Sequence, residues 1–254
     1  MTLLSICRDA ADEIGLDARP VTVVGNPLPE VQRLLRFAQR VGSDLATRAP
    51  WQALRLAHSF TATDTEVQSG AVPATFQRFS PETVWDVTNG LSLTGPVSPV
   101  EYQSRKTAYG TAGYSGDMRW FTRRGNDFLV WPLPAGGELY SYEYQSAAFC
   151  QSASGTPQGE WLADTDTGRI SEELITLGVI ARYLAADGQP SAPAEMAYRE
   201  RLNIEIRNDA PAAGVLPAGD IFGPGRRFTG EPGSSGGLSE FGGSGGGGGG
   251  WTWG

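Results

Sequence analysis

Apolar residues recur every three to four positions in the first fifty residues, and this period predicts two helices. Over residues 2–15 the apolar side chains fall on one face and charged ones on the opposite face. After a linker rich in turn formers, a longer apolar stripe predicts a helix from about Pro29 to Arg48. Pro29 suits the first turn of this helix, because its missing N–H group has no helical partner there.

The middle of the chain changes to a period of two, which predicts strands. The segment ALRLAHSFTAT alternates apolar and polar residues, and so does ELYSYEYQSAAF. Asn89-Gly90 in ETVWDVTNGLSLTG predicts a hairpin, because both residues tolerate the turn conformation that hairpins need. The segment MRWFTRRGNDFLVWPL predicts a second hairpin turning near Gly125-Asn126. Between the two hairpins, SPVEYQSRKTAYG predicts a short helix with Pro99 at its first position.

A helical period returns over residues 171–187 and about 193–208. Ser171 is the predicted N-cap of the first of these helices, with Glu172 and Glu173 in its first turn. The order helix, helix, sheet, helix, helix predicts an α+β fold, a helical bundle with an inserted antiparallel β domain and a long extended Gly-rich C-terminal arm. We divide the chain into N-terminal bundle helices, inserted β domain, C-terminal bundle helices and arm: 1–50, 51–160, 161–210 and 211–254.

The arm has a composition unlike the rest of the chain. It holds 17 of the 34 glycines, and its few apolar residues cannot build a core of their own. Six consecutive glycines lead to two tryptophans, a residue type that often dominates binding energy at interfaces. We therefore predict a flexible segment whose aromatic residues bind a partner. Its candidate partner-binding residues are Phe222, Arg226, Arg227, Phe228, Phe241, Trp251 and Trp253.

The chain is acidic, with a net charge of −8. Sequence-independent DNA binding needs an excess of Lys and Arg, so this class of function is not expected. No apolar run approaches the roughly 20 residues of a membrane span, and the start lacks the basic lead of a signal peptide. We expect a soluble protein made in a cytoplasm. Cys7 and Cys150 each lie in an apolar run, which favours buried free thiols, with a disulfide as the alternative.

A catalytic or metal site is hard to assemble from these residues, and no cofactor motif is present. The single histidine, His58, alternates with apolar residues and is more typical of a packed side chain. The stretch DTDTGRISEELI fails as a calcium loop, because Gly168 falls one place early and Ile175 stands where a glutamate is required. Helix capping explains it better. A hydrolase using the paired carboxylates Asp164 and Asp166 remains a lower-ranked alternative.

Two further groups have a nucleic-acid interpretation and a structural one. Tyr140, Tyr142 and Tyr144 share one face of a predicted strand and could stack bases. With this net charge we favour a half-buried strand in a core or interface. A row of arginines also lines one side of the second helix: Arg33, Arg36 and Arg40. We interpret that row as a solvated or subunit-facing surface.

Several blocks between residues 2 and 208 resemble head-to-tail adaptor proteins of tailed bacteriophages. They are TLLSICRDAADEIGL, VVGNPLPEVQRLLRFAQRVGSDLATRAPWQAL, VPATFQRFSPETVWD, GPVSPVEYQSRK and WLADTDTGRISEELITLGVIARYLAADG. The most characteristic piece is WxxDTDT…EELxxLGxxxRxL. Here it comprises Trp161, Asp164, Thr165, Asp166, Thr167, Glu172, Glu173, Leu174, Leu177, Gly178, Arg182 and Leu184. The Gly-rich arm is not part of the resemblance.

The resemblance implies a structural virion protein rather than an enzyme. Such adaptors form a ring, commonly of twelve copies, in the neck between the portal protein above and a nozzle or other tail protein below. The ring extends the channel through which genomic DNA passes without specific binding, and in several families a C-terminal arm climbs onto the portal. In this chain the arm would anchor to the portal or to a neighbouring subunit. Another neck or tail structural role, as a nozzle or tail-completion protein, is the alternative.

Overall fold

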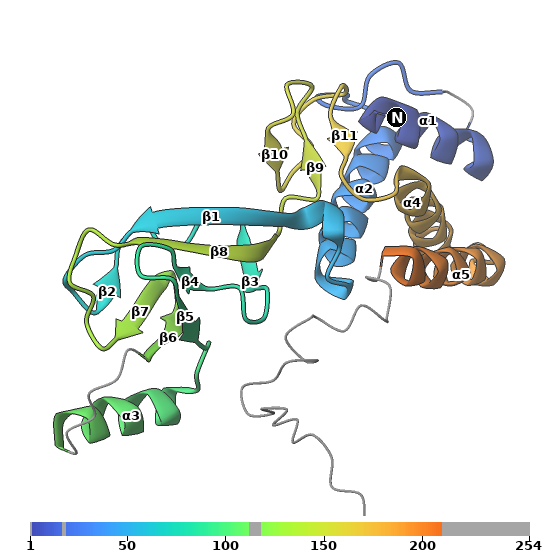
Figure 1. The fold of residues 1–254 in the computed structure, drawn as a ribbon. Helices are drawn as coiled ribbons and strands as arrows, with labels where there is room; N and C mark the ends of the chain where they lie inside the picture. Colours follow the sequence, from blue (N-terminus) through green and yellow to red (C-terminus); the bar gives the residue numbers. More distant parts are fainter. Residues whose placement is uncertain (1, 17–18, 112–117, 210–254) are drawn as a thin grey trace, which may run out of the picture. The chain divides into compact units, whose positions relative to one another are not determined.

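The computed structural model describes residues 2–16, 19–111 and 118–209, and within them the chain has a mixed α+β fold (Figure 1). The described residues contain five α-helices, and each coincides with a predicted one to within about two residues. These helices are α1 (Leu3–Ile14), α2 (Pro29–Arg48), α3 (Pro99–Thr111), α4 (Glu172–Ala186) and α5 (Ala192–Asp209). The sequence patterns therefore predicted every α-helix in the described part of the chain, but not the short 3-10 helix Gln52–Leu54.

Helix α4 lies against three of the other helices, α1, α2 and α5. Most of its side chains are buried, which explains why its sequence is apolar on nearly every side. Ser171 occupies the predicted N-cap position, but its side chain makes no capping hydrogen bond. The first-turn carboxylate of Glu172 instead accepts the backbone N–H of Gly168 at 3.1 Å. The acidic first turn thus holds the preceding loop.

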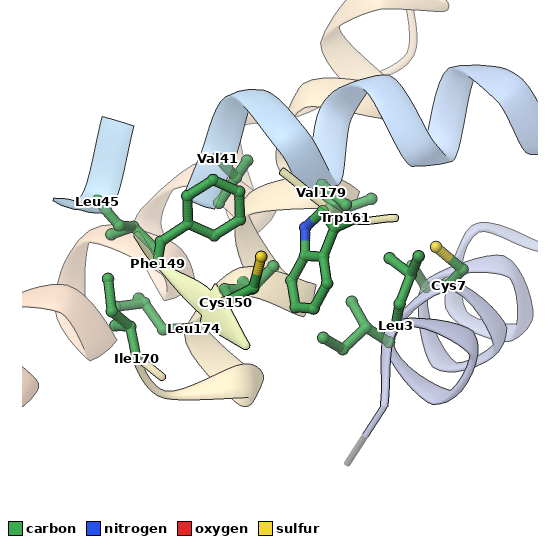
Figure 2. Packing of buried hydrophobic residues seen from close by; sticks show 14 of the residues in the cluster. Leu3, Cys7, Val41, Leu45, Phe149, Cys150, Trp161, Ile170, Leu174 and Val179 are labelled. Carbon is green, nitrogen blue, oxygen red and sulfur yellow. The ribbon is translucent and has the colours of Figure 1, made fainter. Parts of the chain in front are cut away.

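A single apolar cluster joins these helices to residues from the loops around them (Figure 2). Phe149 and Trp161 enter it from outside the helices and meet edge to face, with ring centroids 5.6 Å apart. Gln39 of α2 fixes the approach of Trp161 by accepting its backbone N–H at 3.0 Å. The side chain of Gln39 also donates to the carbonyl of Gly159 at 2.8 Å. The side-chain amide of Gln39 therefore holds the start of the signature against α2, through its oxygen and its nitrogen.

Eight strands form the larger sheet, in the order β1-β8-β4-β5-β6-β7-β2, with β3 also pairing with β8. They are β1 (Arg55–Thr61), β2 (Val67–Gln68), β3 (Phe76–Phe79), β4 (Trp85–Asp86), β5 (Leu91–Thr94), β6 (Arg119–Arg124), β7 (Asp127–Trp131) and β8 (Leu139–Ser146). A smaller sheet has the order β10-β9-β11. Its strands are β9 (Cys150–Gln151), β10 (Pro157–Gln158) and β11 (Thr167–Gly168).

Both predicted hairpins are present, and one differs in detail. Strands β6 and β7 pair up to Arg124 and Asp127, so the turn falls at the predicted Gly125-Asn126. Strands β4 and β5 also form a hairpin, but four residues, 87–90, connect them rather than two. The carboxylate of Asp86 holds this longer loop by accepting the backbone N–H of Asn89 at 3.0 Å.

The β region is mostly antiparallel, as predicted, and one pair of strands departs from that prediction. Strands β5 and β6 pair in parallel, with Leu93 opposite Arg119 and Thr94 opposite Trp120. Parallel neighbours need a crossover connection, and α3 supplies it (Figure 1). The predicted short helix between the hairpins thus reverses the chain so that the second hairpin begins in the same direction as β5.

The larger sheet curls so that strands distant in its order share one aromatic core. Phe60 of β1 meets Phe128 of β7 with ring centroids 5.4 Å apart, and Phe128 stacks on Tyr142 of β8 at 5.9 Å. Phe79 of β3 contacts Phe121 of β6 at 5.2 Å. Aromatic side chains at alternate positions therefore fill the space inside the curl, as large rings at offset and edge-to-face angles commonly do.

Candidate partner-binding surfaces

The partner-binding residues predicted in the arm lie outside the described residues. They are Phe222, Arg226, Arg227, Phe228, Phe241, Trp251 and Trp253. Their role stays a prediction. The other sequence candidates lie within the described part of the chain, where their contacts decide what they do.

Asp164 connects the signature turn to two distant segments. Its carboxylate accepts the backbone N–H of Val24 at 2.8 Å and that of Val23 at 3.1 Å, across 140 and 141 positions of sequence. Its carbonyl oxygen accepts the N–H of Leu4 in the first turn of α1 at 3.2 Å. A helix start leaves such N–H groups without partners, so the turn caps α1 from outside.

Asp166 closes the same turn and is only 2% exposed. One of its carboxylate oxygens accepts two backbone N–H groups, from Leu162 at 2.7 Å and Ala163 at 2.8 Å. Its carbonyl accepts the N–H of Leu3 at 2.8 Å. The interpretation of these aspartates as caps of the following helix was wrong, because they hold the turn, the linker and the start of α1. Both carboxylates accept hydrogen bonds from backbone N–H groups. This is a structural role and not that of a catalytic acid and base pair.

The later residues of the signature also support packing. Glu173 forms an ion pair with Arg201 of α5, with the nitrogen and oxygen 2.7 Å apart, and Arg182 pairs with Asp44 of α2. Gly178 allows α4 to approach α2 closely, since a Cβ atom there would lie 2.7 Å from the side chain of Val41. The signature therefore describes how α1, α2, α4 and α5 fit together.

The tyrosines that could have stacked bases are core residues. Tyr140, Tyr142 and Tyr144 are at most 4% exposed and line the aromatic interior of the sheet. The predicted packing of His58 is confirmed, because its ring meets the edge of Tyr142 with centroids 5.5 Å apart. Burial raises the pKa of Tyr142 above its ordinary value. These side chains are not available to a nucleic acid.

The arginine row of α2 divides into two kinds. Arg33 forms an ion pair with Asp187 at 3.3 Å and lies over the ring of Tyr183, so it acts within the chain. Arg36 and Arg40 are exposed, as expected for a solvated face. The subunit-facing interpretation thus concerns only the exposed pair.

Both cysteines are buried free thiols, which confirms that prediction over the disulfide. Burial raises the pKa of Cys7 to about 12, with a smaller contribution from the charge of Asp164. Burial likewise raises the pKa of Cys150 to about 12. A thiol that stays protonated is a poor nucleophile, so neither cysteine is suited to catalysis.

A charged cluster in the sheet was not predicted. Arg119 of β6 pairs with Asp86 of β4 at 2.8 Å and with Glu138, which directly precedes β8, at 2.7 Å. Its guanidinium also donates to the Tyr140 hydroxyl. Burial opposes the charge of Arg119, but the bonds to Glu138 and Tyr140 outweigh it and raise its pKa. Burial is also the main reason why the pKa of Tyr140 rises to about 12.

A cavity of about 530 Å³ lies beside this cluster. Its apolar walls include Leu91, Tyr109 and Leu133, and its polar side is formed by Asn89, Arg119 and Glu138. The three charged residues come from segments far apart in sequence, and no local period connects them. The sequence contains only a partial sign of this cluster. Two of its acidic residues stand directly beside apolar residues of predicted strands, Asp86 in VWDV and Glu138 in GGELY.

The outward face of the same sheet carries an exposed tryptophan. Trp85 is 47% exposed and lies opposite Ser141 of β8. Val87 and Leu139 continue this exposed apolar surface and are joined by a backbone hydrogen bond of 2.8 Å. Tryptophan is strongly enriched among residues that dominate interfaces, so this surface is a candidate contact.

The described residues contain no group of three or more His, Cys, Asp or Glu side chains placed to hold a metal ion. None of the helices in the same described ranges is both long and apolar enough to cross a membrane. The acidic side chains described above instead form ion pairs or accept hydrogen bonds from the backbone.

Comparison with known proteins identifies the family. A search of curated proteins finds no match. The family model described as SU10 adaptor protein matches residues 1–217, which include every described helix and strand as well as the signature that packs α1, α2, α4 and α5. This is a family of structural phage head-to-tail adaptors and not of enzymes. The chain therefore belongs to the SU10 adaptor protein family.

Proposed function

We propose that this protein forms a ring, of twelve copies by the family precedent, in the neck of a tailed phage. The ring binds the portal protein on one side and a nozzle or other tail protein on the other, and it extends the channel for DNA. The observation that carries this proposal is the family match over residues 1–217, because it covers the whole described fold. The net charge of −8 suits a channel component that DNA passes without adhering.

Within the ring, residues 1–50 and 161–210 would act as one helical bundle, with residues 51–160 inserted as a β domain. The packing of α4 against α1, α2 and α5 supports the first part, because it joins both ends of the chain. The charged cluster of Arg119 and the exposed Trp85 lie in the β part. This division would leave the β domain free to present contacts while the bundle maintains the fold.

The arm, residues 211–254, would anchor each subunit to the portal or to a neighbouring subunit. Its 44 residues could reach about 145 Å when extended, at ~3.3 Å per residue, which allows contacts well beyond the bundle. Trp251 and Trp253 would supply affinity at its tip. Ordering a glycine-rich chain has a high entropic cost, but many arms in one ring act together.

A mixing experiment tests this proposal. Purified portal rings are combined with the full-length chain, with a chain ending at Pro211, and with a full-length double variant, Trp251→Ala and Trp253→Ala. Complexes are measured by mass and by electron microscopy. We expect the full-length chain to form rings on the portal, and the truncated and double-variant chains to bind much more weakly.

Met196→Ala is the control, since it removes an exposed apolar side chain from α5, in the described part of the chain. It should bind the portal as the unaltered chain does. If truncated and full-length chains bind equally, the arm contacts something other than the portal. If no variant binds the portal without another adaptor present, a nozzle or tail-completion role replaces the adaptor proposal.

A further inference from the structure

Asn89 and Gly90 form the end of the four-residue loop 87–90, which connects β4 to β5. They are the one Asn-Gly pair in the sequence. Both residues are exposed, and Gly90 has a φ of +69°, in the left-handed region that glycine tolerates best. The asparagine side chain and the peptide nitrogen that follows it are therefore both accessible to water.

The backbone nitrogen of Gly90 is free to react. In the described part of the chain its N–H group donates no hydrogen bond. Glycine has no Cβ atom to obstruct the approach of this nitrogen to the preceding side chain. A Cβ atom added at Gly90 would meet nothing within 4 Å, so the surroundings also leave room for the loop to move.

We propose that Asn89 is a site of spontaneous deamidation. The nitrogen of Gly90 attacks Cγ of Asn89, and the new bond closes a cyclic succinimide. The bond between Cγ and Nδ2 breaks, and Nδ2 leaves as ammonia with the proton that Gly90 has lost. Water then opens the ring at either carbonyl, which leaves aspartate or isoaspartate at position 89. Water is the only other reactant, so the step needs neither an oxidant nor an enzyme.

Asp86 restrains the side chain that reacts. Nδ2 of Asn89 donates to Oδ2 of Asp86 at 2.8 Å, and the backbone N–H of Asn89 donates to Oδ1 of Asp86 at 3.0 Å. The first of these bonds holds the leaving nitrogen in place, so the folded chain should react more slowly than the unfolded one. The product loses this bond, because an ionised carboxylate has no N–H group to donate.

The product also places a third acidic group beside a single arginine. Asp86 and Glu138 already share the charge of Arg119, at 2.8 Å and 2.7 Å, and Asp86 is inaccessible to solvent. A carboxylate at position 89 would face Asp86 where an amide now donates to it. Like charges repel strongly where water is excluded. The loop should therefore detach from Asp86 once Asn89 has reacted.

This detachment would reach the exposed apolar surface around Trp85. The backbone N–H of Val87 donates to the carbonyl of Leu139 at 2.8 Å, and the N–H of Leu139 donates to the hydroxyl of Thr88 at 2.8 Å. Val87 and Thr88 belong to the same loop, so its release changes how this surface is held. The inference does not depend on a ring or a portal, because it rests on the loop alone.

Mass spectrometry of the folded full-length chain tests the reaction. The chain is incubated in mildly alkaline buffer, which favours loss of the proton from the attacking nitrogen, and is digested with trypsin at intervals. Peptide 79–105 contains Asn89, and peptide 125–169 contains Asn126. We expect peptide 79–105 to gain the mass of one amide-to-acid conversion, as a mixture of aspartate and isoaspartate, while peptide 125–169 stays unchanged.

Asn126 is the control within the same chain. It is exposed in a hairpin turn as Asn89 is, but Asp127 follows it in place of glycine. In Asn89→Gln the longer side chain closes the ring far more slowly, so peptide 79–105 should keep its mass. The proposal is overturned if Asn126 reacts as fast as Asn89, or if peptide 79–105 gains mass in urea and not in the folded chain.

Two variants that carry the charge of the product test its consequence. Asn89→Asp removes a donor to Asp86 and adds a negative charge beside it, so the melting temperature of the full-length chain should fall. Asn126→Asp adds the same charge where the side-chain oxygen already accepts from Arg123 at 3.4 Å, and it should leave the melting temperature unchanged. Equal melting temperatures for the two variants would overturn the detachment of the loop.

Discussion

At the scale of single residues, the aspartates of the signature act on the backbone rather than on a substrate. Asp164 holds Val23 and Val24, and Asp166 holds Leu162 and Ala163. The polar side chains that resembled a paired-carboxylate site are thus the acceptors that an irregular turn needs. Buried N–H groups in such a turn are costly unless something accepts their hydrogen bonds.

Replacing Asp166 with alanine should destabilise the fold. The change leaves the N–H groups of Leu162 and Ala163 without their acceptor in a buried turn. Hydrogen bonds to charged groups contribute about 1.5–3 kcal/mol each, so the loss of two should lower the free energy of unfolding by about 3–6 kcal/mol. Chemical denaturation followed by tryptophan fluorescence measures this.

Asp166→Asn is the matched control, because its amide oxygen can accept both hydrogen bonds from the same position. It should lose less stability than Asp166→Ala. A hydrolase that depended on this carboxylate would show another pattern, with activity lost in both variants while stability was kept. Unchanged stability in Asp166→Ala would contradict the structural role.

At the scale of elements, close approach between helices and neighbouring segments depends on two glycines. Gly42 of α2 faces the ring of Phe149, and Gly178 of α4 faces Val41. In each case a Cβ atom would overlap atoms that are themselves buried. Glycine is a poor helix former, so its place inside α2 and α4 reflects this packing.

Gly42→Ala tests that explanation. Alanine would gain about 1 kcal/mol from its better helix propensity if nothing opposed it. The overlap with Phe149 should cost more than this gain, because overpacking a core costs about 1–3 kcal/mol. We therefore expect a lower free energy of unfolding, measured by thermal and chemical denaturation.

Gly159→Ala provides the comparison, since the nearest atom to its added Cβ lies 4.0 Å away. Its stability should stay within about 0.5 kcal/mol of the unaltered chain. If Gly42→Ala is as stable as Gly159→Ala or more so, α2 and Phe149 are not in the tight contact described above.

At the scale of the whole molecule, charge is the property that bears most directly on the proposed role. The net charge is −8, and the tyrosines that could have stacked bases are buried. A protein that neutralises phosphates needs accessible cations, and here Arg33, Arg119 and Arg182 pair with carboxylates of the same chain.

We predict that the full-length chain does not bind duplex DNA measurably at physiological salt. The dissociation constant should be weaker than about 0.1 mM, the weak end of the range for non-specific binding. Fluorescence polarisation of a labelled duplex measures it, and the same assay at low salt is the control for a local basic patch. Tight binding that falls steeply with added salt would contradict a channel that DNA passes freely.

Much of the local structure follows from the sequence alone. A period of 3.6 residues places the helices, a period of two places the buried tyrosines of β8, and Gly125-Asn126 places a turn. The α+β class follows from the order of these patterns. Each of these features depends on which face of a segment is buried. The order of apolar and polar residues within the segment is enough to predict that face.

Only the tertiary structure determined which segment each buried face packs against. The parallel pairing of β5 and β6, the capping of α1 by a turn more than 150 positions away, and the cluster of Arg119 with Asp86 and Glu138 all join distant segments. Local periodicity carries no information about such partners. They are selected by the packing of the whole chain, where a charge or an N–H group withdrawn from water must find its counterpart.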